Sequence, residues 1–122
     1  MASKYFSDRE LSCRCGCGLM IGPELVEKLD AIREGYGSPL VLSSAARCFE
    51  HNKSVGGAPG SAHLDGRAAD IADPDGSVTL YVLSRLDDLD IYIEDPRFTK
   101  GWIHVQTRPS KARIFTPGKK KG

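Results

Sequence analysis

Hydrophobic and polar positions alternate with helical spacing in one early segment of the chain. In residues 23–33, Leu25, Val26, Leu29 and Ile32 fall on one face, and Pro23 suits the first turn of a helix. Glycines at positions 35 and 37 are suited to lie beyond its end. The pattern predicts a helix over 23–33 that packs against a core.

Short apolar runs elsewhere predict strands. The runs lie at residues 39–43, 67–72, 90–93, 102–105 and 112–115. A second helix is predicted over 77–86, with Ser77 as its N-cap and Leu80, Leu83 and Leu86 facing inward. Residues 48–66 are rich in Gly, Ser, Asn and Pro, which predicts a loop with at most one helical turn. Because the strands cluster late, the order favours an α+β fold with a small, mainly antiparallel sheet and helices packed on it.

Composition limits the classes of protein to which the chain can belong. With 122 residues, it has the length of one domain, so residues 1–122 are interpreted as a single domain. No apolar run is long enough to span a membrane, and residues 1–9 (MASKYFSDR) do not resemble a secretory signal. The net charge of +1 gives no reason to expect a nucleic-acid partner, and Lys119 to Lys121 are interpreted as a flexible basic tail.

Four cysteines stand out in this composition. Cys13, Cys15 and Cys17 alternate in a loop before the first helix, and Cys48 stands alone. Zinc sites with four thiolates usually have ligand pairs that are two to four residues apart, a spacing that these cysteines lack. The sequence therefore favours packed thiols, or one disulfide that joins the N-terminal loop to Cys48, over structural zinc.

The strongest chemical signal is the segment SAHLDGRAAD, residues 61–70. His63 and Asp70 stand seven residues apart in it, and imidazole and carboxylate are both good zinc ligands. His104 lies in the apolar segment GWIHVQ, where a buried imidazole needs a partner. Taken singly, His63 could face water, Asp70 could cap a turn and His104 could be hydrogen-bonded in the core; together the three could form a catalytic metal site.

A family resemblance unites these residues. The chain resembles the zinc D-Ala-D-Ala carboxypeptidase and L-alanyl-D-glutamate endopeptidase family, and in particular its short, phage-associated, single-domain members. The matching segments are SAAR (44–47), HN (51–52), VGGA (55–58), SAHLDGRAAD (61–70) and WIHV (102–105). The resemblance implies a hedgehog/DD-peptidase-like fold with a zinc site at the sheet face.

The same resemblance implies roles for individual residues. His63, Asp70 and His104 would bind Zn²⁺, while Arg47 would pair with a substrate carboxylate or a charged intermediate and Ser61 would add a polar contact to the substrate. An arginine suits this task because its planar fork is always charged. The implied activity is cleavage of peptidoglycan stem peptides, by a carboxypeptidase or an endopeptidase reaction.

The general base is where the sequence departs from the family pattern. Many members have an acidic residue three positions before the last histidine ligand, and short members have one two positions after it; here these positions are Gly101 and Gln106. Gln106 can make a polar contact but cannot act as a base. The nearest acidic residues, Glu94 and Asp95, are therefore the candidates for the general base.

Three interpretations of function follow. The first is a phage endolysin or virion-associated wall-degrading enzyme, located in the virion, or in the host cytoplasm until its release to the periplasm and cell wall. The second is a weakened or inactive member that serves as a structural or wall-binding component of a phage virion, with other phage proteins as partners. In the third, zinc is purely structural and His51 supplies a fourth ligand.

Overall fold

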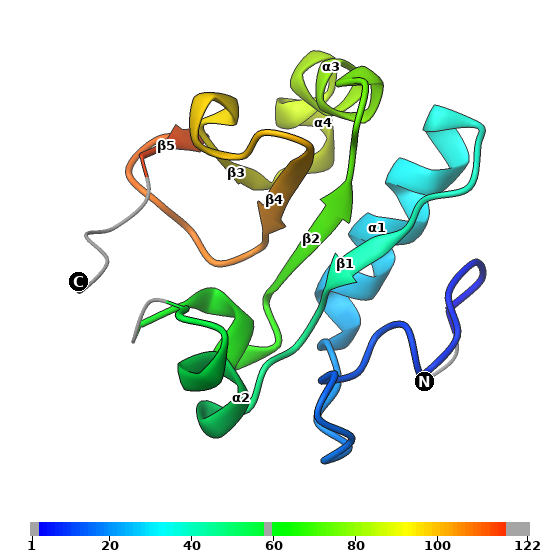
Figure 1. Cartoon of the computed structure of the whole chain (residues 1–122). Coiled ribbons are helices and arrows are strands. Elements are labelled where there is room, and N and C mark those ends of the chain that lie inside the picture. Colours follow the sequence, from blue (N-terminus) through cyan, green and yellow to red (C-terminus); the bar gives the residue numbers. More distant parts are fainter. Residues whose placement is uncertain (1–2, 58–59, 117–122) are drawn as a thin grey trace.

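The computed structural model describes residues 3–57 and 60–116, and its strands form one sheet around which the helices are arranged (Figure 1). In chain order the elements are α1 (Pro23–Tyr36), β1 (Leu42–Ser44), α2 (Phe49–Ser54), the 3-10 helix η1 (Ala62–Asp65), β2 (Ala68–Ala72), α3 (Ser77–Ser84), α4 (Leu86–Leu89), β3 (Tyr92–Glu94), the 3-10 helix η2 (Pro96–Phe98), β4 (Trp102–Gln106) and β5 (Ile114–Phe115). The predicted basic tail at Lys119 to Lys121 lies outside the described residues.

The five strands are ordered β1-β2-β4-β3-β5. All neighbours pair antiparallel except β3 and β5, which are parallel. The α+β class and the mainly antiparallel sheet are therefore as predicted. In the central pair, β2 and β4, Asp70 lies opposite His104.

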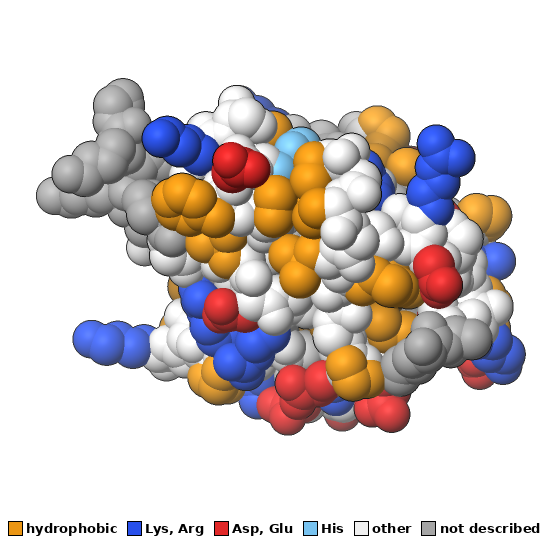
Figure 2. All heavy atoms as spheres, turned by 90° about the horizontal axis from the view of Figure 1, so that it is seen from below, with side chains coloured by type: hydrophobic (Ala, Val, Ile, Leu, Met, Phe, Trp, Pro, Cys, Tyr) orange, Lys and Arg blue, Asp and Glu red, His pale blue; other side chains and the backbone are white. Residues whose placement is uncertain are grey.

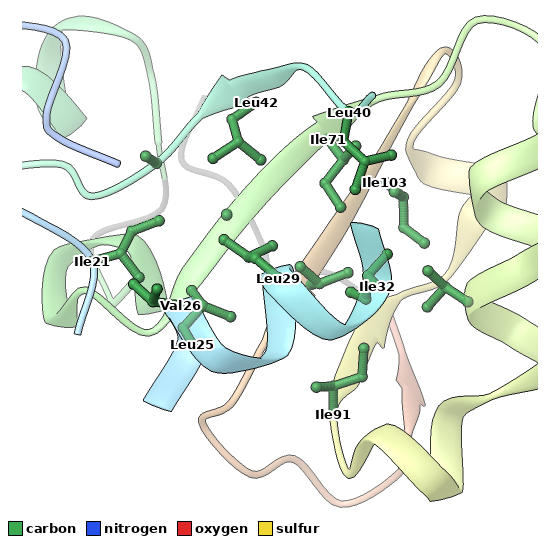
Figure 3. Packing of buried hydrophobic residues seen from close by; sticks show 14 of the residues in the cluster. Ile21, Leu25, Val26, Leu29, Ile32, Leu40, Leu42, Ile71, Ile91 and Ile103 are labelled. Atoms are coloured by element: carbon green, nitrogen blue, oxygen red, sulfur yellow. The ribbon is translucent and has the colours of Figure 1, made fainter. Parts of the chain in front are cut away.

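One face of the sheet carries the hydrophobic core. Side chains alternate between the two faces of a strand, and Ile71 of β2 and Ile103 and Val105 of β4 all belong to the buried core cluster. Figure 3 shows Leu25, Val26, Leu29 and Ile32 of α1 directed towards these strands, as the helical pattern predicts. Asp70, His104 and Gln106 therefore lie on the opposite face.

The first helix extends further than its pattern predicts. It includes Gly35, where a Cβ atom would collide with the side chain of Tyr81, so a glycine allows α1 and α3 to approach closely. The helix ends at Tyr36, and its C-cap, Gly37, has a φ of 83°, the left-handed conformation that glycine adopts without strain.

The predicted helix at 77–86 divides into α3 and α4. Gly76 is the N-cap of α3, and the Asp73 carboxylate accepts hydrogen bonds from the N–H groups of Val78 and Thr79, so Ser77 is not the cap. The prediction that Leu80 faces inward is also wrong, because 70% of this side chain is exposed. Val78 and Val82 are buried, and the other two predicted leucines face inward as expected, since Leu86 is buried and Leu83 packs against the core.

The loop predicted at 48–66 contains more regular structure than expected. It forms α2 and η1, which lie near the start of β2 (Figure 1). None of the helices in the described parts of the chain combines the length and apolar character needed to cross a lipid bilayer.

Charged side chains of both signs share the surface seen in Figure 2. Basic and acidic groups are interspersed there with hydrophobic and uncharged ones, and histidine atoms reach the surface between uncharged and hydrophobic groups (Figure 2). This mixture agrees with the net charge of +1.

Candidate metal centre

The structure brings three of the predicted site residues together on the polar face of the sheet. One ligand atom from each of His63, Asp70 and His104 lies within 4.8 Å of the other two. Asp70 Oδ1 is 3.2 Å from His63 Nε2 and 2.9 Å from His104 Nδ1. His63 comes from η1, Asp70 from β2 and His104 from β4, so three separate elements build the group.

The two imidazoles are held by their other nitrogen atoms. His63 Nδ1 is 2.6 Å from the carbonyl oxygen of Ala45, and since a carbonyl only accepts, Nδ1 carries the proton. His104 Nε2 is 2.7 Å from Gln106 Oε1, while the Gln106 amide nitrogen donates to the Arg108 carbonyl at 2.8 Å, which fixes the orientation of the amide. Each ring therefore directs its second nitrogen towards Asp70, and this is the nitrogen that would bind a metal ion after losing its proton.

The electrostatics of the group favour positive charge at its centre. Burial by itself would raise the pKa of Asp70, but hydrogen bonds from His104 and His63 hold this pKa well below its usual range. Burial lowers the pKa of His104, and the adjacent Asp70 carboxylate outweighs this effect, so that the pKa is raised above its ordinary value. A cation shared by one carboxylate and two imidazoles satisfies the same field, so the donor set fits zinc.

The segment 61–70 owes its path to two residues in particular. Ser61 caps η1, because its hydroxyl accepts a hydrogen bond from the His63 N–H at 3.1 Å. Gly66 has a φ of 69°, and a Cβ atom there would lie 3.0 Å from the Met20 carbonyl oxygen. The turn at Gly66 thus directs the chain from His63 in η1 to Asp70 in β2.

Arg108 braces the loop that carries His63. Its guanidinium donates to Asp65 Oδ2 at 3.0 Å and to the Gly60 carbonyl at 2.6 Å. Neither Arg108 nor the Ala45 carbonyl is predicted from the sequence to belong to the site. Nothing in the local sequence marks them, because both act through contacts between segments that are distant in the chain.

Arg47 lies beside the group. Its backbone N–H donates to the His63 carbonyl at 3.0 Å, and the Asp70 carboxylate acts electrostatically on its guanidinium. Burial lowers the pKa of Arg47, and Asp70 opposes this effect. Arg47 Nε is buried without a hydrogen-bond partner among the described residues.

The two acidic candidates for the general base occupy different environments. Asp95 caps η2 and is bound by Arg97, with Asp95 Oδ2 2.8 Å from Arg97 Nη2. Glu94 is on β3. Ile93 pairs with Val105 of β4, and the next position of this antiparallel register places Glu94 beside His104. The charge of Glu94 also contributes to raising the pKa of His104, after the larger effect of Asp70.

Two other positions that the sequence singles out, Gly101 and His51, lie outside the group. Gly101 has a φ of 85°, a conformation that side chains rarely adopt, and its carbonyl accepts a hydrogen bond from the Asp73 N–H. An acidic residue there would be strained. Among the described residues His51 is not part of the His63, Asp70 and His104 group, so three ligands leave a coordination position open.

Comparison with known proteins agrees with this geometry. A search of curated proteins and a search of solved structures each found no match. A family model described as Peptidase M15 matches residues 4–106, a range that contains every residue of the group. The chain therefore belongs to the Peptidase M15 family of zinc-dependent metallopeptidases.

Proposed function

We propose that this metallopeptidase cleaves the stem peptides of peptidoglycan, as a phage endolysin or as a virion-associated wall-degrading protein. The observation that carries the proposal is the group of three possible ligands, His63, Asp70 and His104, with the Arg47 guanidinium beside it. Three protein ligands and an open position are typical of a catalytic zinc rather than a structural one. Stem peptides end in a carboxylate, which is the kind of group that an arginine binds with two parallel hydrogen bonds.

The metal and the residues of the chain would contribute different parts of the reaction. His63, Asp70 and His104 would hold the zinc, which would supply a bound water with a pKa lowered to about 7 and a Lewis acid for the substrate carbonyl. Gln106 and the Ala45 carbonyl keep the two imidazoles in the required tautomers. Arg47 binds the substrate carboxylate or the oxyanion, because its charge persists despite partial burial.

Glu94 is our proposed general base. It lies on the strand next to His104, on the polar face, whereas Asp95 is engaged by Arg97. In this role the Glu94 carboxylate accepts a proton from the attacking water and then gives it to the leaving amine. This assignment also explains why the chain can lack an acidic residue at Gly101, in the turn before β4, and at Gln106, at the end of β4. In this chain the acidic residue would come from β3 instead.

The test uses the purified protein and purified cell walls. We expect zinc-loaded protein to release peptides that mass spectrometry assigns to cuts within the stem peptide, and we expect chelation to abolish this release. The bonds cut also distinguish carboxypeptidase from endopeptidase action. A matched variant, His63→Ala, should be inactive even with added zinc.

Two outcomes would contradict the proposal. Digestion that persists after metal removal would exclude zinc catalysis. Zinc-loaded protein that leaves all wall peptides intact but sediments with cell walls would instead support a wall-binding component of a phage virion. Gly101, which occupies a position where many members have an acid, is the feature that favours this second function.

A further inference from the structure

The four cysteines form a second group of possible metal ligands, separate from His63, Asp70 and His104. The sulfur atoms of Cys13, Cys15, Cys17 and Cys48 all lie within 4.8 Å of one another. The Sγ atom of Cys15 is 3.3 Å from that of Cys13 and 3.6 Å from that of Cys48. Three of these residues belong to the loop before α1, and Cys48 is the N-cap of α2.

These separations match a single tetrahedral ion. With a zinc to sulfur distance of about 2.3 Å, four thiolates at the corners of a tetrahedron lie about 3.8 Å apart. A disulfide needs about 2.05 Å between two sulfur atoms and would use the cysteines only in pairs. Four sulfur atoms that all lie within 4.8 Å of one another are instead the pattern of thiolates that share one soft cation.

Backbone groups around the sulfur atoms already favour thiolates. The Cys48 N–H donates to Cys13 Sγ at 3.4 Å, and the His51 N–H donates to Cys48 Sγ at 3.4 Å. These N–H groups stabilise negative charge on the two sulfur atoms, as metal-bound thiolates require.

The loop is folded so that alternate cysteines meet, which explains how a spacing unusual for zinc can serve. Gly16 and Gly18 have φ values of 84° and 93°, which allow the chain to reverse. The Cys13 N–H then donates to the Leu19 carbonyl at 2.7 Å. The Arg14 guanidinium holds the loop to β1 by donating to the Leu42 carbonyl at 2.8 Å.

We propose that Cys13, Cys15, Cys17 and Cys48 form a second, structural metal site that binds one Zn²⁺ and ties the N-terminal loop to α2. Binding forms four zinc–sulfur bonds and releases the thiol protons to solvent, with no change in oxidation state. Four protein ligands leave no position for water, so the site is structural and not catalytic. Since Cys48 directly follows Arg47, the ion would also fix the segment that carries this arginine.

The experiment separates the two metal sites in the full chain. Metal content and cobalt spectra are measured for the wild type, for His63→Ala/His104→Ala and for Cys15→Ser/Cys17→Ser. We expect about two zinc ions in the wild type and about one in each double variant. Cobalt in the histidine variant should show thiolate-to-metal charge-transfer bands, and cobalt in the cysteine variant should lack them.

The stability of the loop supplies a second readout, independent of peptidase activity. In the His63→Ala/His104→Ala background, zinc removal should increase hydrogen exchange in residues 9–18 and 48–52 and leave α1 protected. A cobalt spectrum without thiolate bands would overturn the proposal. So would a disulfide in the freshly purified chain, seen as a mass two hydrogens lower, or iron and sulfide in place of zinc.

Discussion

At the scale of single residues, the carboxylates of Glu94 and Asp95 are neighbours in the chain with different surroundings. Glu94 lies on the strand beside His104, whereas Asp95 is bound by Arg97. We expect Glu94→Gln to lower kcat on a wall peptide about 10²- to 10⁴-fold, because the base is lost while the metal ligands remain.

The matched control for this prediction is Asp95→Asn, which should change kcat little. Zinc content is measured in both variants and should equal that of the wild type. Equal losses of kcat in the two variants, or a loss confined to Asp95→Asn, would contradict the role assigned to Glu94.

The hydrogen bonds of Gln106 lead to a second prediction at the scale of single residues. Its amide oxygen accepts the proton of His104 Nε2 and its amide nitrogen is held by the Arg108 carbonyl. Gln106→Ala removes the acceptor that fixes the ring, so zinc affinity should fall about 10- to 100-fold. Gln106→Glu keeps an oxygen acceptor and should retain affinity in the same chelator-competition assay; a weakening shared by both variants would argue against orientation of His104 as the cause.

At the scale of elements, the turn after η1 decides where His63 lies relative to β2. Gly66 has a positive φ, and a Cβ atom there would press on the Met20 carbonyl at 3.0 Å. Gly37 at the end of α1 also has a positive φ, but a Cβ atom there meets nothing within 4 Å. Comparing substitutions at these two glycines therefore separates the effect of backbone strain from the effect of crowding near the metal site.

We expect Gly37→Ala to destabilise the fold by about 1–3 kcal/mol through strain alone. Gly66→Ala should cost more free energy of unfolding and should also weaken zinc binding, because η1 must shift. Urea denaturation and zinc titration of both variants measure the two effects. The interpretation fails if zinc binds equally tightly to both variants.

At the scale of the whole molecule, zinc bound by His63, Asp70 and His104 would join three elements that are distant in sequence. An ion bound by η1, β2 and β4 stabilises only the folded state, by about 2.7 kcal/mol at a concentration one hundred times the Kd. For a chain of this length, that corresponds to a rise in Tm of about 10 °C.

Thermal unfolding with and without zinc measures this effect. His63→Ala/His104→Ala removes the contribution of the histidine group, so its gain in Tm should be smaller than that of the wild type. Equal gains in the two proteins would show that zinc stabilises the fold without using these ligands.

Features that depend on local spacing can be predicted from the amino-acid sequence of this protein. The buried face of α1 follows from apolar residues at helical intervals. The segment 61–70 indicates metal binding because His63 and Asp70, two residues of zinc-ligand type, lie close together in it. Such patterns are informative because neighbouring residues in one helix or one turn have a nearly constant geometry.

The contacts between distant groups depend instead on how the whole chain packs. Antiparallel pairing of β2 with β4 sets Asp70 opposite His104, and the register of β3 on β4 brings Glu94 beside His104. The meeting of Cys48 with the N-terminal loop likewise depends on where α2 begins. Strand register and loop path arise from packing over the whole chain, so local spacing does not encode them.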